Sequence, residues 1–207
     1  LKGLHEVIVE TPHHNEMIYQ IKHLDEVLET YALRMKELFK PDYVKYVMLF
    51  RNHGPYSGAS LKHPHSQIIA LPIVPLRIKD ELEQYEAFYK KQKKCLMCQI
   101  IKREIKENIR ILYTNNDFCV FAPFAARFNF ELWISPLKHE TDFYRTKNFK
   151  SLSDAIKFTF QKLHYSLKEP SYNIIFHTSP KSRKIFHWHI EILPKISMPA
   201  GFEWGTG

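Results

Sequence analysis

Two stretches of the chain place histidines at alternate positions ahead of an apolar run and a proline. They are HPHSQIIALP at 63–72 and HWHIEILP at 187–194. Alternate side chains of a strand point to one face, so each stretch predicts a strand that presents a His-x-His-x-(Gln/Glu) row on one side. Because the same unit must then be built twice, this duplication constrains the fold more than any other feature.

The spacing of two upstream histidines supports the repeat. His14 lies 49 residues before His63, and His139 lies 48 residues before His187. Each half reads strand, helix, strand and His-x-His strand, a pattern typical of an antiparallel sheet with one packed helix. We therefore predict an α+β protein made of two tandem units of one kind.

Hydrophobic periodicity locates the elements of both units. We expect strands at 5–11, 43–50, 63–72, 109–114, 118–123, 129–136, 172–178 and 187–194, and helices at 15–39, 78–107 and 147–168. Asn15 is the expected N-cap of the first helix. The first unit then covers residues 1–76, and the second covers residues 77–207.

Composition narrows the class of protein. Hydrophobic residues make up 44% and charged residues 25% of the chain, as in ordinary globular proteins. We see neither an apolar run of the ~20 residues that a membrane span needs nor a signal-peptide pattern, so we expect a cytoplasmic protein with no membrane partner. The net charge of +8 suits a phosphate-bearing ligand. No stripe of basic and aromatic residues favours nucleic acid.

A Cys-x-x-Cys pair precedes the histidines of the second unit. Cys95, Cys98, His139 and His187 offer the two thiolates and two imidazoles that tetrahedral zinc selects. The alternative is a reduced thiol pair with two unrelated histidines. The third cysteine, Cys119, alternates with apolar residues and predicts a buried small side chain.

The first unit has only half of this ligand set. His14 and His63 occupy the matching places, but the corresponding cysteine pair would fall upstream of Leu1. We therefore expect that the first unit is incomplete, that its metal site is weak, and that the chain is a piece of a longer protein.

The row on the first His-x-His strand suits nucleophilic chemistry on phosphorus. His65 lies on the same face as His63 and Gln67, and a neutral imidazole can attack the phosphorus of a nucleotide diphosphate and carry the nucleotidyl group. In the second unit Glu191 replaces Gln67, and a carboxylate there would repel a phosphate. We therefore expect only the first unit to be catalytic.

A glycine-bearing loop, RNHGPYSGAS at 51–60, leads into this strand. Gly54 and Gly58 allow the backbone to approach phosphate oxygens, while Asn52 and Ser60 supply side-chain donors.

These segments resemble one known family. FRNHGPYSGASLKHPHSQIIALP at 50–72 is similar to the active-site segment of galactose-1-phosphate uridylyltransferases, which belong to the histidine-triad superfamily. HEVIVETPHHN at 5–15, FAPFAARFNFELWISPLKH at 121–139 and GFEWGTG at 201–207 resemble other segments of the family. The resemblance covers essentially the whole chain.

The resemblance implies a role for each residue of the first motif. It implies that His65 is the nucleophile that becomes uridylylated and that Gln67 stabilises the uridylyl-enzyme. It also implies that Asn52, Gly58 and Ser60 contact the phosphates. It implies a ping-pong transfer of UMP between UDP-glucose and galactose 1-phosphate by a homodimer.

The resemblance also implies metals. His14 and His63 become half of a first zinc site, and Cys95, Cys98, His139 and His187 become a second. Other family members bind iron through one Glu and three His. Glu81, His177 and His189 match three of those ligands, but Glu191 stands at the fourth position, which argues against iron here.

Two alternatives stay open at this stage. An ADP-sugar phosphorylase, or a dinucleotide phosphorylase or adenylyltransferase, uses the same scaffold and the same His-x-His-x-Gln row. A non-catalytic, zinc-stabilised nucleotide-binding module would need neither His65 nor Gln67.

Overall fold

The computed structural model describes residues 2–181, 183–196 and 201–206. The strands are β1 (Leu4–Val9), β2 (Tyr46–His53), β3 (His65–Leu71), β4 (Ile111–Thr114), β5 (Phe118–Phe121), β6 (Leu132–Pro136), β7 (Ser171–His177) and β8 (His189–Lys195). The helices are α1 (Leu24–Leu38), α2 (Leu76–Gln92), α3 (Leu96–Glu107), α4 (Phe149–Leu167) and the short α5 (Gly201–Thr206). No helix in these ranges is long and apolar enough to cross a membrane.

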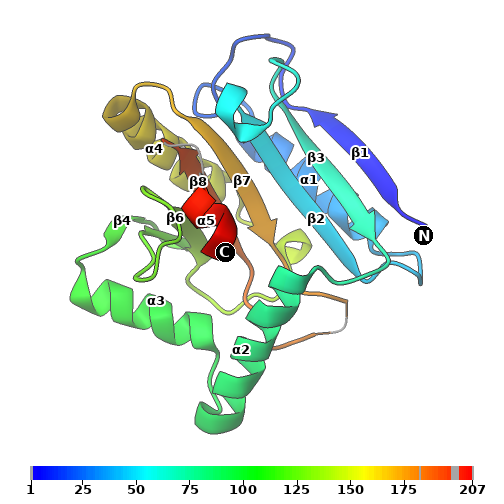
Figure 1. Ribbon diagram of the computed structural model, residues 1–207, viewed down its shortest axis with the longest axis vertical. Helices are drawn as coiled ribbons and strands as arrows, with labels where there is room; N and C mark the ends of the chain where they lie inside the picture. Colours follow the sequence, from blue (N-terminus) through cyan, green and yellow to red (C-terminus); the bar gives the residue numbers. More distant parts are fainter. Residues whose placement is uncertain (1, 182, 197–200, 207) are drawn as a thin grey trace.

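All eight strands join one antiparallel sheet in the order β1-β3-β2-β7-β8-β6-β5-β4 (Figure 1). The order is the same in both halves, β1-β3-β2 and β6-β8-β7, as the sequence repeat requires. The halves meet where β2 pairs with β7, with Leu49 opposite Phe176. The α+β fold class is thus confirmed. The sheets of the two units form one continuous sheet, and the division at residues 76/77 remains a prediction.

Helices α1 and α4 cover one face of the sheet and lie behind it in Figure 1. Their apolar sides pack on the residues of β2, β3, β7 and β8 that alternate toward them, and together these make the main core. Leu24 and Leu28 of α1 and Leu152 of α4 are completely or almost completely buried there. The opposite face of β1, β3 and β2 remains open, and it carries His65 and Gln67.

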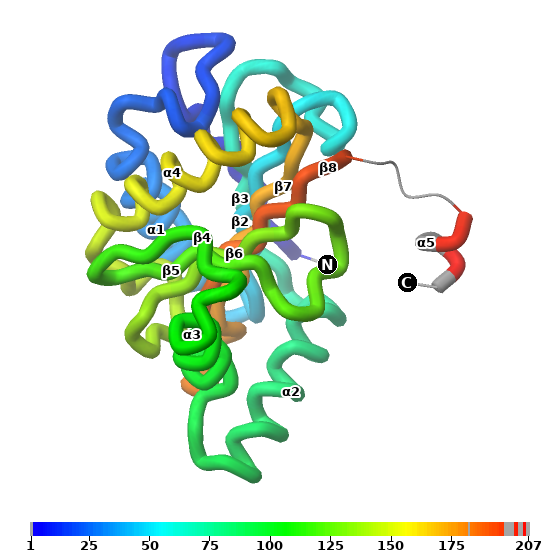
Figure 2. Tube along the Cα trace, turned by 90° about the vertical axis from the view of Figure 1, so that its left-hand side faces the viewer, coloured from blue at the N-terminus to red at the C-terminus, as the bar shows by residue number. Residues whose placement is uncertain are grey.

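A second, smaller core lies on the opposite face of the sheet. Helices α2 and α3 pack Leu82, Tyr85, Met97 and Ile101 against Cys119 and Phe121 of β5. Cys119 is buried, as its alternating pattern predicts. The view from the side places α1 and α2 on opposite sides of the sheet (Figure 2). These helices therefore leave the first unit's strands uncovered on the His65 face.

The helix predictions need two corrections. Helix α1 begins at Leu24, with His23 as its N-cap, so Asn15 is not a cap. The apolar pattern between them is real, because Ile18 and Ile21 are buried, but these residues lie in a segment of turns and irregular backbone ahead of the helix. The expected helix at 78–107 is two helices, because Lys93 takes a left-handed backbone (φ 56°) that ends α2 ahead of the Cys-x-x-Cys turn.

Candidate active site and metal centre

The first residue of strand β3, His65, is 8% exposed on the open face. Its Nδ1 lies 2.7 Å from the carbonyl oxygen of His63. A carbonyl only accepts, so Nδ1 carries the proton and Nε2 keeps its electron pair. The strand thereby holds the imidazole in the tautomer in which Nε2 is unprotonated and able to act as a nucleophile.

A buried ion-pair network supports this strand from the core side. The carboxylate of Glu10 accepts hydrogen bonds from Arg51 Nε (2.9 Å), Ser66 Oγ (2.6 Å) and Tyr31 Oη (2.7 Å). The Arg51 guanidinium also bonds Tyr172 Oη at 2.6 Å. Since Ser66 directly follows His65, the network holds β3 in place next to His65.

No motif in the sequence singled out Glu10 and Arg51. Each is a charged residue at the end of an apolar strand pattern, and this feature of the sequence could have identified them. Glu10 is 5% and Arg51 2% exposed, and such charges are buried in proteins only when they are paired.

The glycine-bearing loop is shaped by close contacts. At Gly54 (φ 82°), an added Cβ would lie 2.3 Å from Ser171 Oγ, so only glycine fits. Gly58 also has a positive φ, 79°. Asn52 accepts a 2.7 Å hydrogen bond from Asn173 Nδ2, which orients its amide. The last residue pair of β2 and β3 is Phe50 with Gln67. Following the same antiparallel register two residues further places Asn52 opposite His65.

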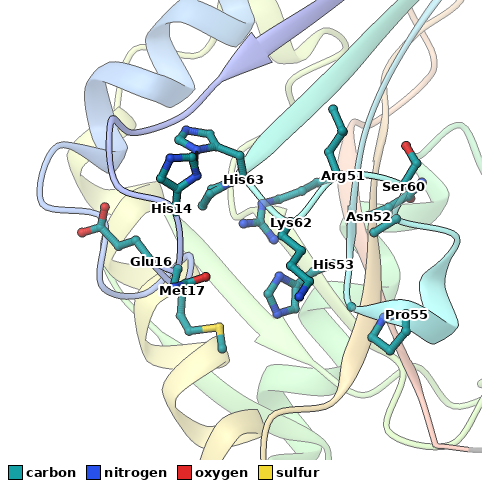
Figure 3. Close-up of a pocket in the computed structure, with 15 residues that line it drawn as sticks. His14, Glu16, Met17, Arg51, Asn52, His53, Pro55, Ser60, Lys62 and His63 are labelled. Carbon is teal, nitrogen blue, oxygen red and sulfur yellow. Dashed lines mark hydrogen bonds between the residues drawn. The ribbon is translucent and has the colours of Figure 1, made fainter.

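A cavity of about 400 Å³ lies next to this loop, with Asn52, Ser60, His14 and His63 among its lining residues. Figure 3 shows His14 and His63 together on one side, and Asn52 and Ser60 on the other. Lys62, Arg51 and His53 lie between them. His65, Gln67 and Gly58 do not line this cavity. The structure thus divides the predicted site between the cavity and the adjoining sheet face.

The four predicted ligands of the second unit converge. Cys98 Sγ lies 3.4 Å from His187 Nδ1 and 3.8 Å from His139 Nδ1, and Cys95 Sγ lies 3.7 Å from His187 Nδ1. All four ligand atoms lie within 4.8 Å of one another. Zinc bonds to sulfur and nitrogen imply tetrahedral edges of about 3.3–3.8 Å, so the donor set fits a zinc ion.

Supporting hydrogen bonds and electrostatics agree with metal binding there. His187 Nε2 donates to the Pro136 carbonyl (3.0 Å) and His139 Nε2 to the Lys184 carbonyl (3.4 Å), which leaves both Nδ1 atoms free to coordinate. The Cys98 thiol, together with His139 and His187, lowers the pKa of Cys95, so one thiolate is available at neutral pH.

The first unit repeats half of this arrangement. His14 Nδ1 and His63 Nδ1 face each other at 3.0 Å, and His63 Nε2 donates to the Thr11 carbonyl at 2.7 Å. The two rings stand at 88°, as His139 and His187 stand at 90°. Among the described residues, no cysteine or carboxylate completes this pair into a group of three ligands.

A third cluster contains Glu81, His177 and His189 within 4.8 Å of one another. His177 bonds Glu81 through Nδ1 (2.8 Å) and faces Glu191 through Nε2 (3.2 Å). Burial opposes protonation of His177, but the two carboxylates outweigh it and raise its pKa to about 9. Arg127 also bonds Glu191, at 2.5 Å. These side chains thus form an ion-pair network around His177. Their ligand atoms also lie close enough together to hold a metal ion, and His189 Nε2 is buried without a hydrogen-bond partner among the described residues.

Known proteins share this sequence and fold. The chain is 33% identical to ADP-glucose phosphorylase from Arabidopsis thaliana, over 99% of the chain and 60% of that protein. It is 31% identical to galactose-1-phosphate uridylyltransferase from Thermotoga maritima, over 99% of the chain and 69% of that protein. Residues 2–74 also match a family model described as "Domain of unknown function (DUF4931) N-terminal domain".

Solved structures agree. An ADP-glucose phosphorylase from Arabidopsis thaliana with bound ADP-glucose aligns with a TM-score of 0.91 at 33% identity, over 99% of this chain and 68% of that chain. A uridylyltransferase mutant aligns with a TM-score of 0.92 at 30% identity, over 99% and 72%. These proteins are thus similar to the chain in both sequence and fold. The chain belongs to the galactose-1-phosphate uridylyltransferase family, and it spans 60% of the length of the Arabidopsis phosphorylase.

Proposed function

We propose that this protein transfers a nucleotidyl group from a nucleotide sugar through a covalent intermediate on His65. The observation that carries the proposal is the 2.7 Å contact between His65 Nδ1 and the His63 carbonyl. The contact supports this role because it leaves Nε2 unprotonated, and it would stabilise the positive charge that the ring acquires when Nε2 bonds to phosphorus.

The proposed step conserves atoms and charge. His65 Nε2 attacks the α-phosphorus of the nucleotide sugar, and the bond from that phosphorus to the bridging oxygen breaks. The sugar 1-phosphate leaves with that oxygen, and the nucleotidyl group stays on His65. An acceptor phosphate then attacks the same phosphorus and restores the free imidazole. Gln67 donates to a phosphoryl oxygen, and Asn52, Gly58 and Ser60 contact the phosphates.

The finer proposal is UMP transfer between UDP-glucose and galactose 1-phosphate. The second candidate is adenylyl transfer from ADP-glucose to phosphate, and the 33% identity to an ADP-glucose phosphorylase favours it. In both proposals zinc stays structural, held by Cys95, Cys98, His139 and His187. A homodimer and a cytoplasmic location belong to the same proposal.

The test is the intact mass of the protein after incubation with UDP-glucose or ADP-glucose and no acceptor. We expect an added UMP or AMP that maps to His65, and the base identifies the donor. His65→Asn should abolish the adduct, while the exposed His13→Asn should retain it. Adding galactose 1-phosphate or inorganic phosphate to the adduct then shows which acceptor removes it.

Absence of any adduct from folded, zinc-loaded protein would overturn the transferase proposal. Retained nucleotide binding in the same sample would favour the non-catalytic binding module.

A further inference from the structure

A histidine outside the His-x-His-x-Gln row contacts Gln67. His5 Nε2 on β1 lies 3.0 Å from Gln67 Oε1 on β3. The antiparallel register pairs Val7 with Gln67 and His5 with Ile69, so His5 is the diagonal neighbour of Gln67 on the open face. The contact therefore joins two residues 62 positions apart through the strand pairing alone.

The direction of this hydrogen bond sets the orientation of the Gln67 amide. An amide has one accepting end and one donating end. Along β3 the open face carries His65, Gln67 and Ile69 in turn, and His5 lies beside Ile69. With Oε1 held by His5, the carbonyl end turns away from His65, and the NH₂ end is left on the side of His65.

This orientation matters because a phosphoryl group offers only acceptors. The NH₂ end of Gln67 can donate to a phosphoryl oxygen, whereas a flipped amide would place its carbonyl oxygen against the phosphate and repel it. We propose that His5 is a positioning residue that keeps the amide of Gln67 turned with its NH₂ toward the phosphoryl group on His65. The inference rests on the proposed function for its catalytic consequence.

The surroundings of His5 make it suitable for a direct test. Its side chain is exposed on the edge strand β1, outside both hydrophobic cores and all three ligand clusters. Replacing it therefore removes the hydrogen bond without opening a cavity or removing a metal ligand.

The kinetic experiment follows the rate of nucleotidyl-His65 formation in the full chain. His5→Leu should slow it about tenfold, the effect of losing one hydrogen bond. His5→Gln, whose amide NH₂ reaches the place of Nε2, should restore most of the rate. In a Gln67→Ala background, His5→Leu should have no further effect. His23→Leu, another exposed histidine, is the matched control and should leave the rate unchanged.

An equal loss from His5→Leu with and without Gln67 would overturn the inference, since His5 would then act by another route. An unchanged rate in His5→Leu would overturn it as well.

A spectroscopic experiment decides the inference without turnover. Nitrogen-15 NMR of the histidine rings should show His5 protonated at Nε2, and His5→Leu should shift the Gln67 side-chain NH₂ signals. His5→Gln should shift them less. An unprotonated Nε2 or unmoved Gln67 signals would contradict the proposed contact. If no adduct forms but these signals behave as expected, the transferase proposal fails and the His5–Gln67 contact stands.

Discussion

At the scale of single residues, His53 shows how the buried charges beneath His65 affect their neighbours. Its ring stacks on Tyr172, with centroids 4.8 Å apart. Burial, and then the positive charge of Arg51, lower the pKa of His53 to about 4. The folded protein thus holds His53 neutral at a pH where the unfolded chain protonates it.

The sign of the resulting pH dependence follows from linkage. The pKa of His53 is about 6.5 in the unfolded chain and about 4 in the fold, so the unfolded state binds more protons between these values. The stabilisation that the fold gains from holding His53 neutral is present above pH 6.5 and is lost as the pH falls toward 4. His53→Phe keeps the stacking on Tyr172 and does not titrate. When the pH falls from 7 to 5, we expect the free energy of unfolding of this variant to decrease by about 1 kcal/mol less than that of the wild type, a value reduced for the partial exposure of His53.

Urea unfolding at both pH values measures this difference. The exposed His13→Phe is the matched control and should keep the wild-type pH slope. Equal slopes in His53→Phe and the wild type would contradict the assignment.

At the scale of elements, the first turn of helix α3 contacts the sheet through the cysteine–histidine cluster. Cys95 is its N-cap and Cys98 lies in that turn. They meet His139 and His187, which lie just after β6 and just before β8. These contacts join the connection between α2 and α3 to the strands. This connection contains Lys93, where the single helix expected at 78–107 is interrupted.

The zinc content of the protein tests this contact between α3 and the sheet. We expect the protein to bind one zinc tightly at this cluster, and Cys95→Ser or Cys98→Ser to lose it, because two thiolates supply half of the ligands. Cys119→Ala should keep the metal, since Cys119 is buried in β5 away from the cluster. Removing the metal with a chelator should speed hydrogen exchange in residues 93–100 and leave β1 and β3 unchanged. Zinc retained by both serine variants would reject the site.

At the scale of the whole molecule, the pairing of β2 with β7 makes the two halves one sheet. Leu49 and Phe176 oppose each other across this pair and are 0% and 2% exposed. Helices α1 and α4, one from each half, contribute to the same core on this face. Each half therefore buries apolar surface against the other.

We expect cooperative unfolding in one transition. Leu49→Ala should lower the free energy of unfolding by about 2–5 kcal/mol, the usual loss for a leucine in a packed core. Because the core is shared, the fluorescence of Trp133 and Trp188 in the second half and hydrogen exchange in β1–β3 should report the same midpoint. The exposed Leu33→Ala should change stability by less than about 1 kcal/mol. Two separate midpoints would show that the halves fold independently.

The sequence by itself determined the α+β class, the eight strands, the repeat and the two His-x-His rows, because alternation and spacing are local properties of the chain. It also predicted the ligand set of the second unit, since cysteine and histidine are the ligands zinc prefers. It placed the start of α1 too early, because Ile18 and Ile21 keep a helical spacing while being buried in a segment of turns and irregular backbone.

Only the tertiary structure decided how distant residues pair. The joining of β2 to β7, the ion pair of Glu10 with Arg51 and the contact of His5 with Gln67 all depend on strand order and register. Local alternation shows which face of a strand is buried, and so restricts its register, but it does not show which strand lies beside it. The role proposed for His65 thus follows from its motif, whereas the groups that orient its neighbours depend on how the strands pair.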